Sequence, residues 1–242
     1  MGRRSLLKKM NYFDAVYCIC MADRPRKRDF LLKQIKHFYP DLKPIVFDAV
    51  NTRHIKGKGH HVGCAISHRN VMLDAKTQGF KRIMVFEEDA ILHKNFKNIL
   101  SKATEEIKGR PWDLFYLGAH CQRNIKKNPF PNEENCQYLL RPRAMTCTHG
   151  ICYNETFYDW VIDRVPSEIE KAHVWCNQNV AIDQWYRNFQ NQNNDSYKKY
   201  IGRSSIAYIT SPIITSQPFM LSGPHYPHAQ DRREDFLHEK EI

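Results

Sequence analysis

The sequence predicts an α/β protein with a mostly parallel central sheet. Short apolar segments alternate with segments of helical periodicity as far as residue 118, an order that is typical of strand–helix–strand units. Hydrophobic residues make up 42% of the 242 residues, enough to bury a sizeable core. Apolar runs reach only about six residues, whereas a membrane-spanning helix needs roughly 20. We therefore expect one domain, residues 14–222, between a basic extension, residues 1–13, and a mobile tail, residues 223–242.

Strands and helices alternate through the first half of the chain. A buried strand at 15–21 is followed by a charged turn and by Pro25, a residue favoured in the first turn of a helix. A polar loop at 51–62 precedes a helix at 63–77, for which Gly79 is a suitable C-terminal cap. The other elements expected here are helices at 25–38 and 96–107 and strands at 44–50, 82–86 and 114–117.

The second half of the chain is less regular. A long polar loop with two prolines is expected at 120–135, and no internal repeat is visible. Apolar patterns predict strands at 137–140, 147–153 and 205–210, helices at 156–164 and 180–189, and a polar loop at 190–199.

Charge is the main anomaly of the composition. Lys and Arg number 37 against 26 Asp and Glu, a net charge of +11 that attracts phosphate groups. Three classes of partner follow: a nucleic acid, an anionic membrane surface or a phosphorylated small molecule. No helix-turn-helix, zinc-finger or aromatic RNA-binding signature supports the first class. Basic residues near the N-terminus leave a peripheral membrane contact open.

The eight cysteines predict reduced thiols and not a disulfide framework. The N-terminus has basic residues but no apolar stretch of signal-peptide length, so we expect a cytoplasmic protein. The cysteines include no Cys-x-x-Cys pair, which argues against a structural zinc site.

Three consecutive acids, Glu87, Glu88 and Asp89, directly follow the apolar strand at 82–86. Their charges repel one another, and a divalent cation would relieve that repulsion. Carboxylate oxygens suit Mg²⁺ or Mn²⁺. Open α/β sheets bind their ligands at the carboxyl ends of parallel strands, where this triplet is expected to lie. A solvated acidic turn is the alternative.

Two further segments carry candidate binding residues. Arg24 and Arg28 lie one helical turn apart at the start of a helix, where guanidinium groups and backbone amides can bind an anion; a solvated basic face is the alternative. Cys64 and His68 share one face of a later helix, but a nucleophilic Cys–His pair lacks a visible third group. We therefore expect small residues to let this helix pack tightly while Ser67 or His68 faces a ligand.

Asp183 is an acid among apolar neighbours near the predicted start of a helix. It fits a first-turn charge favoured by the helix dipole, and it equally fits a base whose pKa is set by its surroundings. The local sequence alone favours the first interpretation.

Taken in order, the motifs of this chain form a series. The segments concerned are 19–28, 47–50, the Gly-Cys-x-x-Ser-His motif at 63–68, the acids at 87–89, 112–118, 148–153, Asp183, 212–217 and Ser222. In this order and spacing they resemble glycosyltransferase family 25, which includes lipopolysaccharide sugar transferases of bacteria and collagen β-galactosyltransferases. Two positions depart from the family pattern: Cys20 stands where the family has Asn, and Glu88 where it has Asp.

The resemblance implies a GT-A type fold, which is a Rossmann-like α/β sandwich that uses a nucleotide-diphosphate sugar. It implies a UDP-linked hexose, galactose or glucose, as the donor, with Mn²⁺ or Mg²⁺ bridging the diphosphate and the acidic motif. Glu87-x-Asp89 keeps two carboxylates at the spacing of the GT-A Asp-x-Asp pattern, so Asp89 is the expected metal ligand and Glu87 a ligand or a ribose contact. The other expected contacts of the nucleotide sugar are Arg24, Arg28, Ser67 and Glu88.

The resemblance also implies inversion at the anomeric carbon, which requires a general base on the acceptor hydroxyl opposite the leaving group. Asp183 matches a downstream Asp of the family and is the first candidate, with His68 second. Trp185 or Tyr186 could stack on the acceptor sugar, because aromatic rings offer flat apolar platforms. The acceptor is expected to be a glycan or a hydroxyl group of a protein.

Two other functions stay open from the sequence. The net charge would suit a nucleic-acid-binding module, although we expect no nucleic-acid partner because the signatures of such modules are absent. The departures at Cys20 and Glu88 leave open a catalytically inactive, transferase-like interaction protein. Turnover of a nucleotide sugar, and not binding alone, separates the enzyme from both alternatives.

Overall fold

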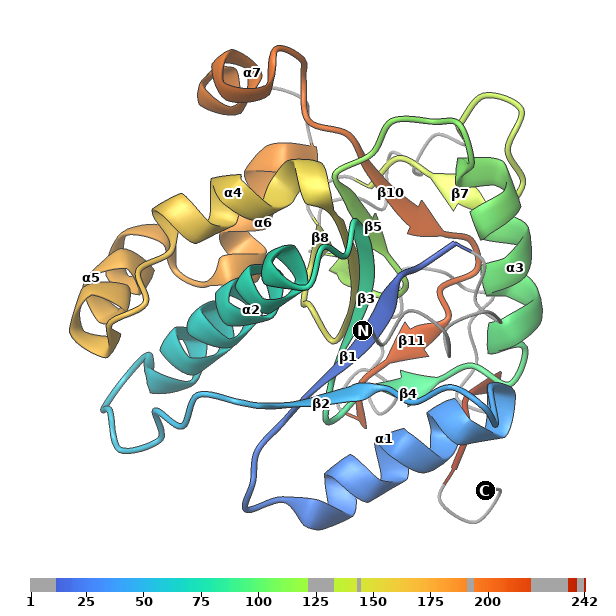
Figure 1. The fold of residues 1–242 in the computed structure, drawn as a ribbon, viewed down its shortest axis with the longest axis horizontal. Coiled ribbons are helices and arrows are strands. Elements are labelled where there is room, and N and C mark those ends of the chain that lie inside the picture. Colours follow the sequence, from blue (N-terminus) through green and yellow to red (C-terminus); the bar gives the residue numbers. More distant parts are fainter. Residues whose placement is uncertain (1–11, 122–132, 143–144, 191–193, 219–234, 239–241) are drawn as a thin grey trace.

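A seven-stranded sheet forms the centre of the computed structural model, which describes residues 12–121, 133–142, 145–190, 194–218, 235–238 and 242 (Figure 1). In spatial order the strands are β2 (Ile45–Asp48), β1 (Ala15–Cys20), β3 (Arg82–Glu87), β9 (Gly150–Asn154), β5 (Leu114–Tyr116), β10 (Ala207–Thr210) and β7 (Leu139–Leu140). Five of the seven strands run in one direction, whereas β9 and β7 run antiparallel to their neighbours. The predicted α/β sandwich with a mostly parallel central sheet is confirmed.

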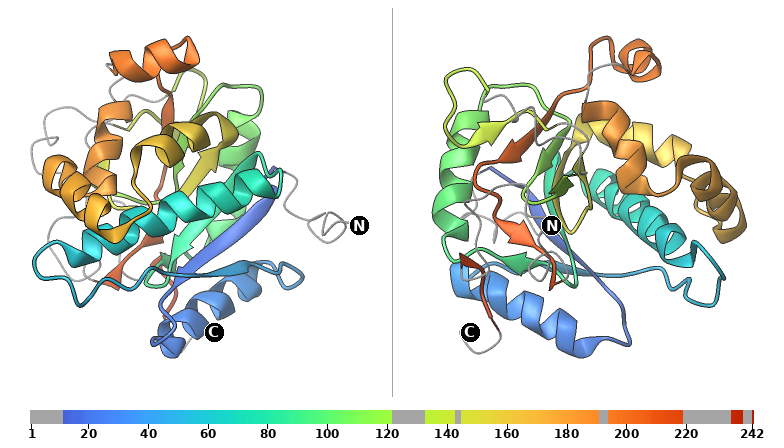
Figure 2. Two further views of the ribbon diagram at one scale, coloured as in Figure 1. Left: turned by 60° about the vertical axis from the view of Figure 1, so that its left-hand side comes forward. Right: turned by 180° about the vertical axis from the view of Figure 1, so that it is seen from behind.

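Helices cover both faces of this sheet, and Figure 2 shows the sheet between the two layers. One layer holds α2 (Gly59–Thr77), α4 (Glu155–Arg164), α5 (Ile169–Asn179) and α6 (Ile182–Gln190). The opposite layer holds α1 (Pro25–Phe38) and α3 (Phe96–Ile107). The remaining elements are α7 (Asp195–Ile201) and two small ribbons that pair β4 (Ile91–Leu92) with β11 (Thr215–Ser216) and β6 (His120–Cys121) with β8 (Met145–Thr146).

The central strands are apolar along their whole length because both of their faces are buried. In β1, Tyr17 and Ile19 point into the core shared with α2, whereas Val16 and Cys18 point into the core shared with α1 and α3. Strand β3 alternates in the same way. This arrangement explains why the sequence shows continuous apolar runs in place of the polar–apolar alternation of a half-exposed strand.

The predictions for the second half of the chain need correction. The polar loop predicted at 190–199 is wrong in its second part, because α7 begins at Asp195. The Asn194 side chain accepts a hydrogen bond from the Tyr197 amide at 2.9 Å, and the Tyr197 ring is buried. Helix α5 was not expected at all. In each case one buried apolar face stabilises a helix whose local sequence is mostly polar.

Both ends of the predicted domain extend further than the sequence indicates. Tyr12 and Phe13, the last residues of the predicted basic extension, are buried, and Trp112 Nε1 donates to Tyr12 Oη at 2.7 Å. Phe236 and Leu237 lie within the predicted mobile tail, yet both are buried against β4. Apolar burial therefore holds part of each terminal segment to the domain. Among the helices that the structure describes, none has both the length and the apolar character that crossing a membrane requires.

Candidate functional site

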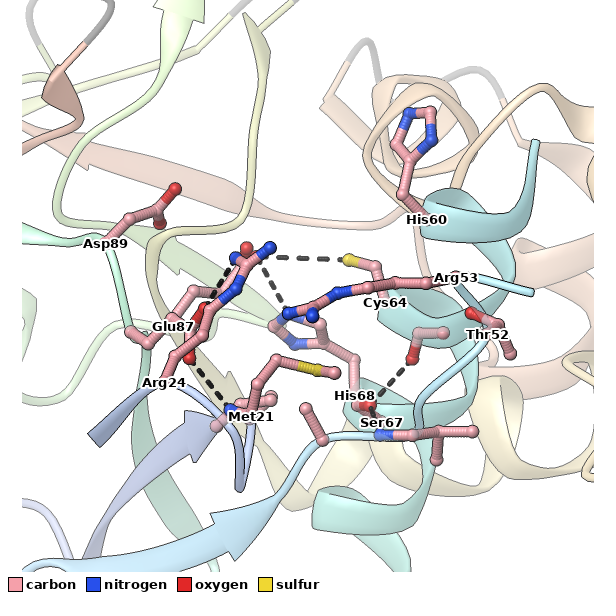
Figure 3. A pocket seen from close by; sticks show the side chains of 15 residues that line it. Met21, Arg24, Thr52, Arg53, His60, Cys64, Ser67, His68, Glu87 and Asp89 are labelled. Carbon is pink, nitrogen blue, oxygen red and sulfur yellow. Dashed lines mark hydrogen bonds and ion pairs between the residues drawn. The ribbon is translucent and has the colours of Figure 1, made fainter. Parts of the chain in front are cut away.

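The candidate site is a cavity of about 190 Å³ where β1, β2 and β3 end (Figure 3). Because these three strands are parallel neighbours, their carboxyl ends meet at the same edge of the sheet. The loops that follow them supply one wall each, and the N-terminal half of α2 closes the cavity from one side. All three members of the acidic triplet line this cavity, as the sequence predicts.

Strand alternation separates the three carboxylates. Glu87 continues the face of β3 that points to α2, where it contacts His68, and Glu88 points the opposite way toward Arg24 at the start of α1. Asp89 lies beyond the strand and contacts Gln217. The three acids therefore have three different environments and cannot all have the same role.

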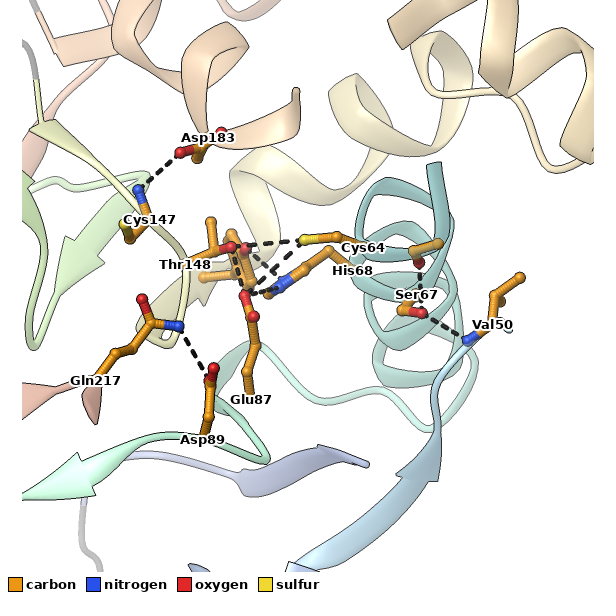
Figure 4. A network of polar contacts seen from close by, with 12 residues as sticks. Val50, Cys64, Ser67, His68, Glu87, Asp89, Cys147, Thr148, Asp183 and Gln217 are labelled. Carbon is orange, nitrogen blue, oxygen red and sulfur yellow. Dashed lines mark hydrogen bonds and ion pairs between the residues drawn. The ribbon is translucent and has the colours of Figure 1, made fainter. Parts of the chain in front are cut away.

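Glu87 is held by a network that comes from two other elements (Figure 4). Its Oε1 atom lies 3.2 Å from His68 Nε2 on α2 and accepts a hydrogen bond from Thr148 Oγ1 at 2.6 Å. Burial opposes ionisation of this carboxyl group, but the hydrogen bonds and the attraction to His68 outweigh burial and lower the pKa of Glu87 below its ordinary value. Glu87 is therefore an ionised carboxylate with a fixed orientation.

Glu88 connects the ends of two strands. Its Oε1 accepts a hydrogen bond from Arg24 Nη1 at 2.8 Å, and its Oε2 accepts one from the Met21 amide at 2.8 Å. Both oxygens are therefore occupied by the turn between β1 and α1. This geometry gives Glu88 a positioning role for Arg24 and leaves Glu87 and Asp89 as the carboxylates available to a ligand.

Asp89 has fewer hydrogen-bond partners than Glu87 and Glu88. Gln217 Nε2 donates to its Oδ1 at 3.0 Å. Burial and, after it, repulsion from Glu87 raise the pKa of Asp89 above its ordinary value. Among the residues that the structure describes, no hydrogen-bond donor reaches Asp89 Oδ2 or Glu87 Oε2. Two mutually repelling carboxylates, each with a free oxygen, fit a hard divalent cation such as Mn²⁺ or Mg²⁺.

Ser67 holds α2 against the segment that follows β2. Its hydroxyl donates to the Gly63 carbonyl at 2.6 Å and accepts from the Val50 amide at 2.9 Å. Gly63 allows this approach, because a Cβ atom there would lie 2.5 Å from the Val50 carbonyl oxygen. Ser67 is 1% exposed and lines the cavity, where it fixes the wall between α2 and the segment after β2; its contact with a nucleotide sugar stays a prediction.

His68 and Cys64 lie one turn apart on the face of α2 that meets Glu87. His68 is fully buried, and its Nδ1 lies 2.8 Å from Tyr153 Oη, so both ring nitrogens have protein partners. Cys64 Sγ lies 3.9 Å from Glu87 Oε1 and 3.8 Å from Thr148 Oγ1. Burial, followed by the charge of Glu87, raises the pKa of Cys64 well above its ordinary value, which argues against a thiolate nucleophile in the free protein.

The two arginines expected at the site differ in their placement. Arg24 lines the cavity, whereas Arg28 does not line it and pairs with Asp29 at 3.3 Å. Arg53, which the sequence did not single out, lines the cavity and donates to Asp23 at 2.6 Å. Figure 3 shows Arg24 and Arg53 reaching over the cavity from opposite sides. The position of Arg53 after β2, next to β1 in the sheet, is the signal that could have identified it.

Asp183 lies in the first turn of α6 and supports the Thr148 segment. Its Oδ2 accepts a hydrogen bond from the Cys147 amide at 2.9 Å, and its Oδ1 accepts one from the Gln184 amide at 2.8 Å. Cys147 has a φ of 72°, a conformation that favours glycine, so this hydrogen bond stabilises a strained turn. Asp183 is not among the residues that line the cavity.

The aromatic residues after Asp183 belong mainly to the core. Tyr186 is fully buried and contacts Tyr153 and Phe157 edge to face, so the expectation that it stacks on a sugar is wrong. Trp185 is half-buried and lies 5.4 Å from Trp175, measured between ring centroids. The helical pattern alone does not distinguish the core-facing ring from the partly exposed one.

The sequence is similar to members of glycosyltransferase family 25. Residues 57–165 match the family model described as glycosyltransferase family 25 (LPS biosynthesis protein). The chain is 31% identical over 210 residues to the mouse (Mus musculus) protein "Inactive glycosyltransferase 25 family member 3" and 29% identical over 218 residues to the human (Homo sapiens) protein of that name. Each alignment covers 70% of this chain and 35% of the relative, so the chain spans about a third of the length of these relatives.

One solved structure has a weak likeness to the whole fold. It is a glycosyltransferase involved in the glycosylation of the major capsid of PBCV-1, with 9% identity and a TM-score of 0.39. The alignment covers 86% of this chain and 83% of that one. At this TM-score the likeness adds nothing to the function of the site.

Proposed function

The chain belongs to glycosyltransferase family 25, and from this premise we propose that it is a metal-dependent, inverting hexosyltransferase. The proposed donor is a UDP-linked hexose, galactose or glucose, and the proposed acceptor is a hydroxyl group of a glycan or a protein. One observation carries this proposal: Glu87 and Asp89 each keep a carboxylate oxygen without a described donor, at the strand ends that form the cavity.

Glu87 and Asp89 are the residues that would hold the divalent cation. When bound, Mn²⁺ or Mg²⁺ would supply positive charge that stabilises the diphosphate leaving group. On the protein side, His68 and Thr148 fix the orientation of Glu87, and Gln217 fixes that of Asp89. The carboxylates are thus oriented before a ligand enters, which lowers the cost of ordering them.

Arg24 and Arg53 are proposed to bind the phosphate oxygens of the donor. Guanidinium groups suit phosphate because they offer several N–H donors in one plane. Each arginine already has an acidic partner, Glu88 for Arg24 and Asp23 for Arg53, so each side chain is positioned over the cavity. Positive charge on both sides of the cavity would stabilise the charge that develops on the departing UDP.

Asp183 is the proposed general base, and His68 is proposed as a positioning residue. Figure 4 shows Asp183 beyond Thr148 as seen from Glu87, with its contact to the Cys147 amide. The Gln184 amide orients the other oxygen of Asp183. A carboxylate in this orientation can accept the proton of an acceptor hydroxyl that enters from the α6 side. His68 contacts Glu87 and Tyr153 inside the protein, so its role in this proposal is to hold Glu87.

A panel of nucleotide sugars tests the proposal. We expect Mn²⁺-dependent release of UDP from UDP-galactose or UDP-glucose, and we expect Asp89→Asn to lower that rate by about 100-fold or more. Asp163→Asn, which changes an exposed acid at the end of α4, is the matched control and should leave the rate unchanged. Full activity of Asp89→Asn would overturn the assignment of the metal site.

A protein that binds a nucleotide sugar without turnover is the second candidate. The mouse and human relatives are named inactive glycosyltransferases, which favours this candidate. Calorimetry with UDP and Mn²⁺ distinguishes the two. Saturable binding of UDP together with no release of UDP from any sugar in the panel would support the inactive protein over the enzyme.

A further inference from the structure

We propose that Cys64, His68 and Glu87 form a second kind of metal site, one that takes a thiophilic divalent cation such as Zn²⁺ or Co²⁺. One ligand atom from each residue lies within 4.8 Å of the other two. The site shares Glu87 with the hard-cation site but uses a sulfur and a nitrogen in place of Asp89. It does not depend on sugar transfer, because the three ligands belong to the folded protein itself.

The distances between the ligand atoms suit a tetrahedral ion. Neighbouring ligands of zinc are roughly 3.2 to 3.8 Å apart, given zinc–ligand bonds of about 2.0 to 2.3 Å. Glu87 Oε1 lies 3.2 Å from His68 Nε2 and 3.9 Å from Cys64 Sγ. Cys64 and His68 meet the looser bound of 4.8 Å between ligand atoms, so binding of the ion would draw the thiol and the imidazole together.

The backbone fixes these three residues in place. Cys64 and His68 lie at positions i and i+4 of α2, so their side chains point to the same side of the helix. Helix α2 is anchored beside them to the segment after β2 by the hydrogen bond from the Val50 amide to the Ser67 hydroxyl. Glu87 ends β3, a strand paired on both sides, by β1 and by β9. The ligands therefore come from rigid elements.

Hydrogen bonds around the three ligands are those that a metal site requires. His68 Nδ1 lies 2.8 Å from Tyr153 Oη. In the metal-bound form the ring proton would lie on Nδ1 and be donated to that oxygen, so that Nε2, which donates to Glu87 in the metal-free protein, presents its lone pair to the cation. Thr148 Oγ1 donates to Glu87 Oε1 and orients the carboxylate. Three protein ligands leave a fourth position for water or for a ligand from the cavity, which all three residues line.

The ligand set selects against Mn²⁺ and Mg²⁺. A thiolate and an imidazole favour Zn²⁺ and Co²⁺, whereas hard cations favour oxygen ligands. Binding replaces the S–H bond of Cys64 by a sulfur–metal bond and releases one proton to solvent, so affinity should increase with pH. If the proposed transferase function holds, Zn²⁺ at this site would occupy Glu87 and inhibit the Mn²⁺-dependent reaction.

Cobalt spectroscopy tests this site without any nucleotide sugar. Adding Co²⁺ to the whole, reduced protein should produce a thiolate-to-cobalt charge-transfer band in the near ultraviolet, at one equivalent, and Zn²⁺ should abolish that band. Cys64→Ser should remove the band. The matched control is Cys147→Ser, which changes another partly exposed cysteine beside the same network and should keep the band.

A second variant covers the case in which Cys64→Ser does not fold. Glu87→Gln keeps the thiol and the imidazole, and we expect it to weaken Co²⁺ binding by at least about tenfold. No band in the folded wild-type protein, or a band that persists in Cys64→Ser, would overturn the proposal. A negative cobalt result would not contradict the proposed sugar transfer. An absence of sugar transfer would likewise not contradict the proposed Zn²⁺ or Co²⁺ site.

Discussion

The Glu88 carboxylate accepts a hydrogen bond from Arg24 Nη1 at 2.8 Å, so the middle acid of the triplet fixes the turn after β1. The second Glu88 oxygen binds the Met21 amide of the same turn. Glu88 is one of the two positions that depart from the family pattern, and its side chain reaches a neighbouring strand end. The role of Glu88 is therefore to hold the Arg24 side chain in position.

Glu88→Gln is therefore expected to weaken donor binding more than it slows turnover. The ion pair is lost and Arg24 loses its fixed position, so KM for the donor should increase while kcat changes less. The cost in the free energy of unfolding should be about 1 kcal/mol, because the Arg24 side chain is 42% exposed and solvent screens the pair. Steady-state kinetics and urea unfolding measure the two effects.

Glu105→Gln is the matched control for Glu88. Glu105 forms an exposed pair with Lys108 on the surface, and its loss should change the free energy of unfolding by less than about 0.5 kcal/mol. An equal loss of stability in both variants, with an unchanged KM in Glu88→Gln, would contradict the positioning role of Glu88.

Ser67→Ala should destabilise the protein because the Val50 amide loses its hydrogen-bond acceptor. The hydroxyl bonds two backbone groups at a site that is 1% exposed, and the substitution leaves both without that partner. The expected loss is about 1 to 3 kcal/mol in the free energy of unfolding. Ser101→Ala, at an exposed position of α3, provides the comparison and should lie within about 0.5 kcal/mol of wild type. Equal stability of Ser67→Ala and wild type in urea would show that this contact does not hold α2.

The lowered pKa of Glu87 predicts a loss of stability in acid. The carboxyl group binds a proton less readily in the folded protein than in the unfolded chain, so its contribution is fully present above its ordinary pKa of 4.5. That contribution disappears as the pH falls through the lowered value in the folded state. Urea unfolding between about pH 3 and about pH 6 should show a steeper dependence for wild type than for Glu87→Gln. Parallel curves would mean that His68 and Thr148 do not favour the ionised form.

The sequence predicts most of the first half of the fold because its signals are local. Pro25 and the periodicity after it give the bounds of α1, and continuous apolar runs identify β1 and β3 as strands buried on both faces. The antiparallel insertion of β9 between β3 and β5 is not visible in the same way. It depends on pairing between segments that lie far apart in the chain, which local periodicity does not encode.

The candidate site likewise combines residues found from local sequence patterns with residues that only the fold brings together. The acidic triplet and the motif around Cys64 and His68 are local patterns, and the structure brings them together. Thr148 contacts Glu87 from 61 positions away along the chain, and Gln217 contacts Asp89 from 128 positions away. Arg53 lines the cavity from a loop whose sequence has no recognisable pattern. Which member of the triplet remains available to a ligand depends on those partners, so the sequence could not decide it.

Manganese binding by Asp89→Asn tests the central claim most directly. In the presence of UDP, the electron paramagnetic resonance signal of free Mn²⁺ should decrease on addition of wild-type protein and of the surface control Asp163→Asn. With Asp89→Asn, folded as judged by circular dichroism, the signal should stay near its protein-free value because one of the two carboxylates is lost. Equal loss of the free Mn²⁺ signal with Asp89→Asn and with wild type would contradict the account.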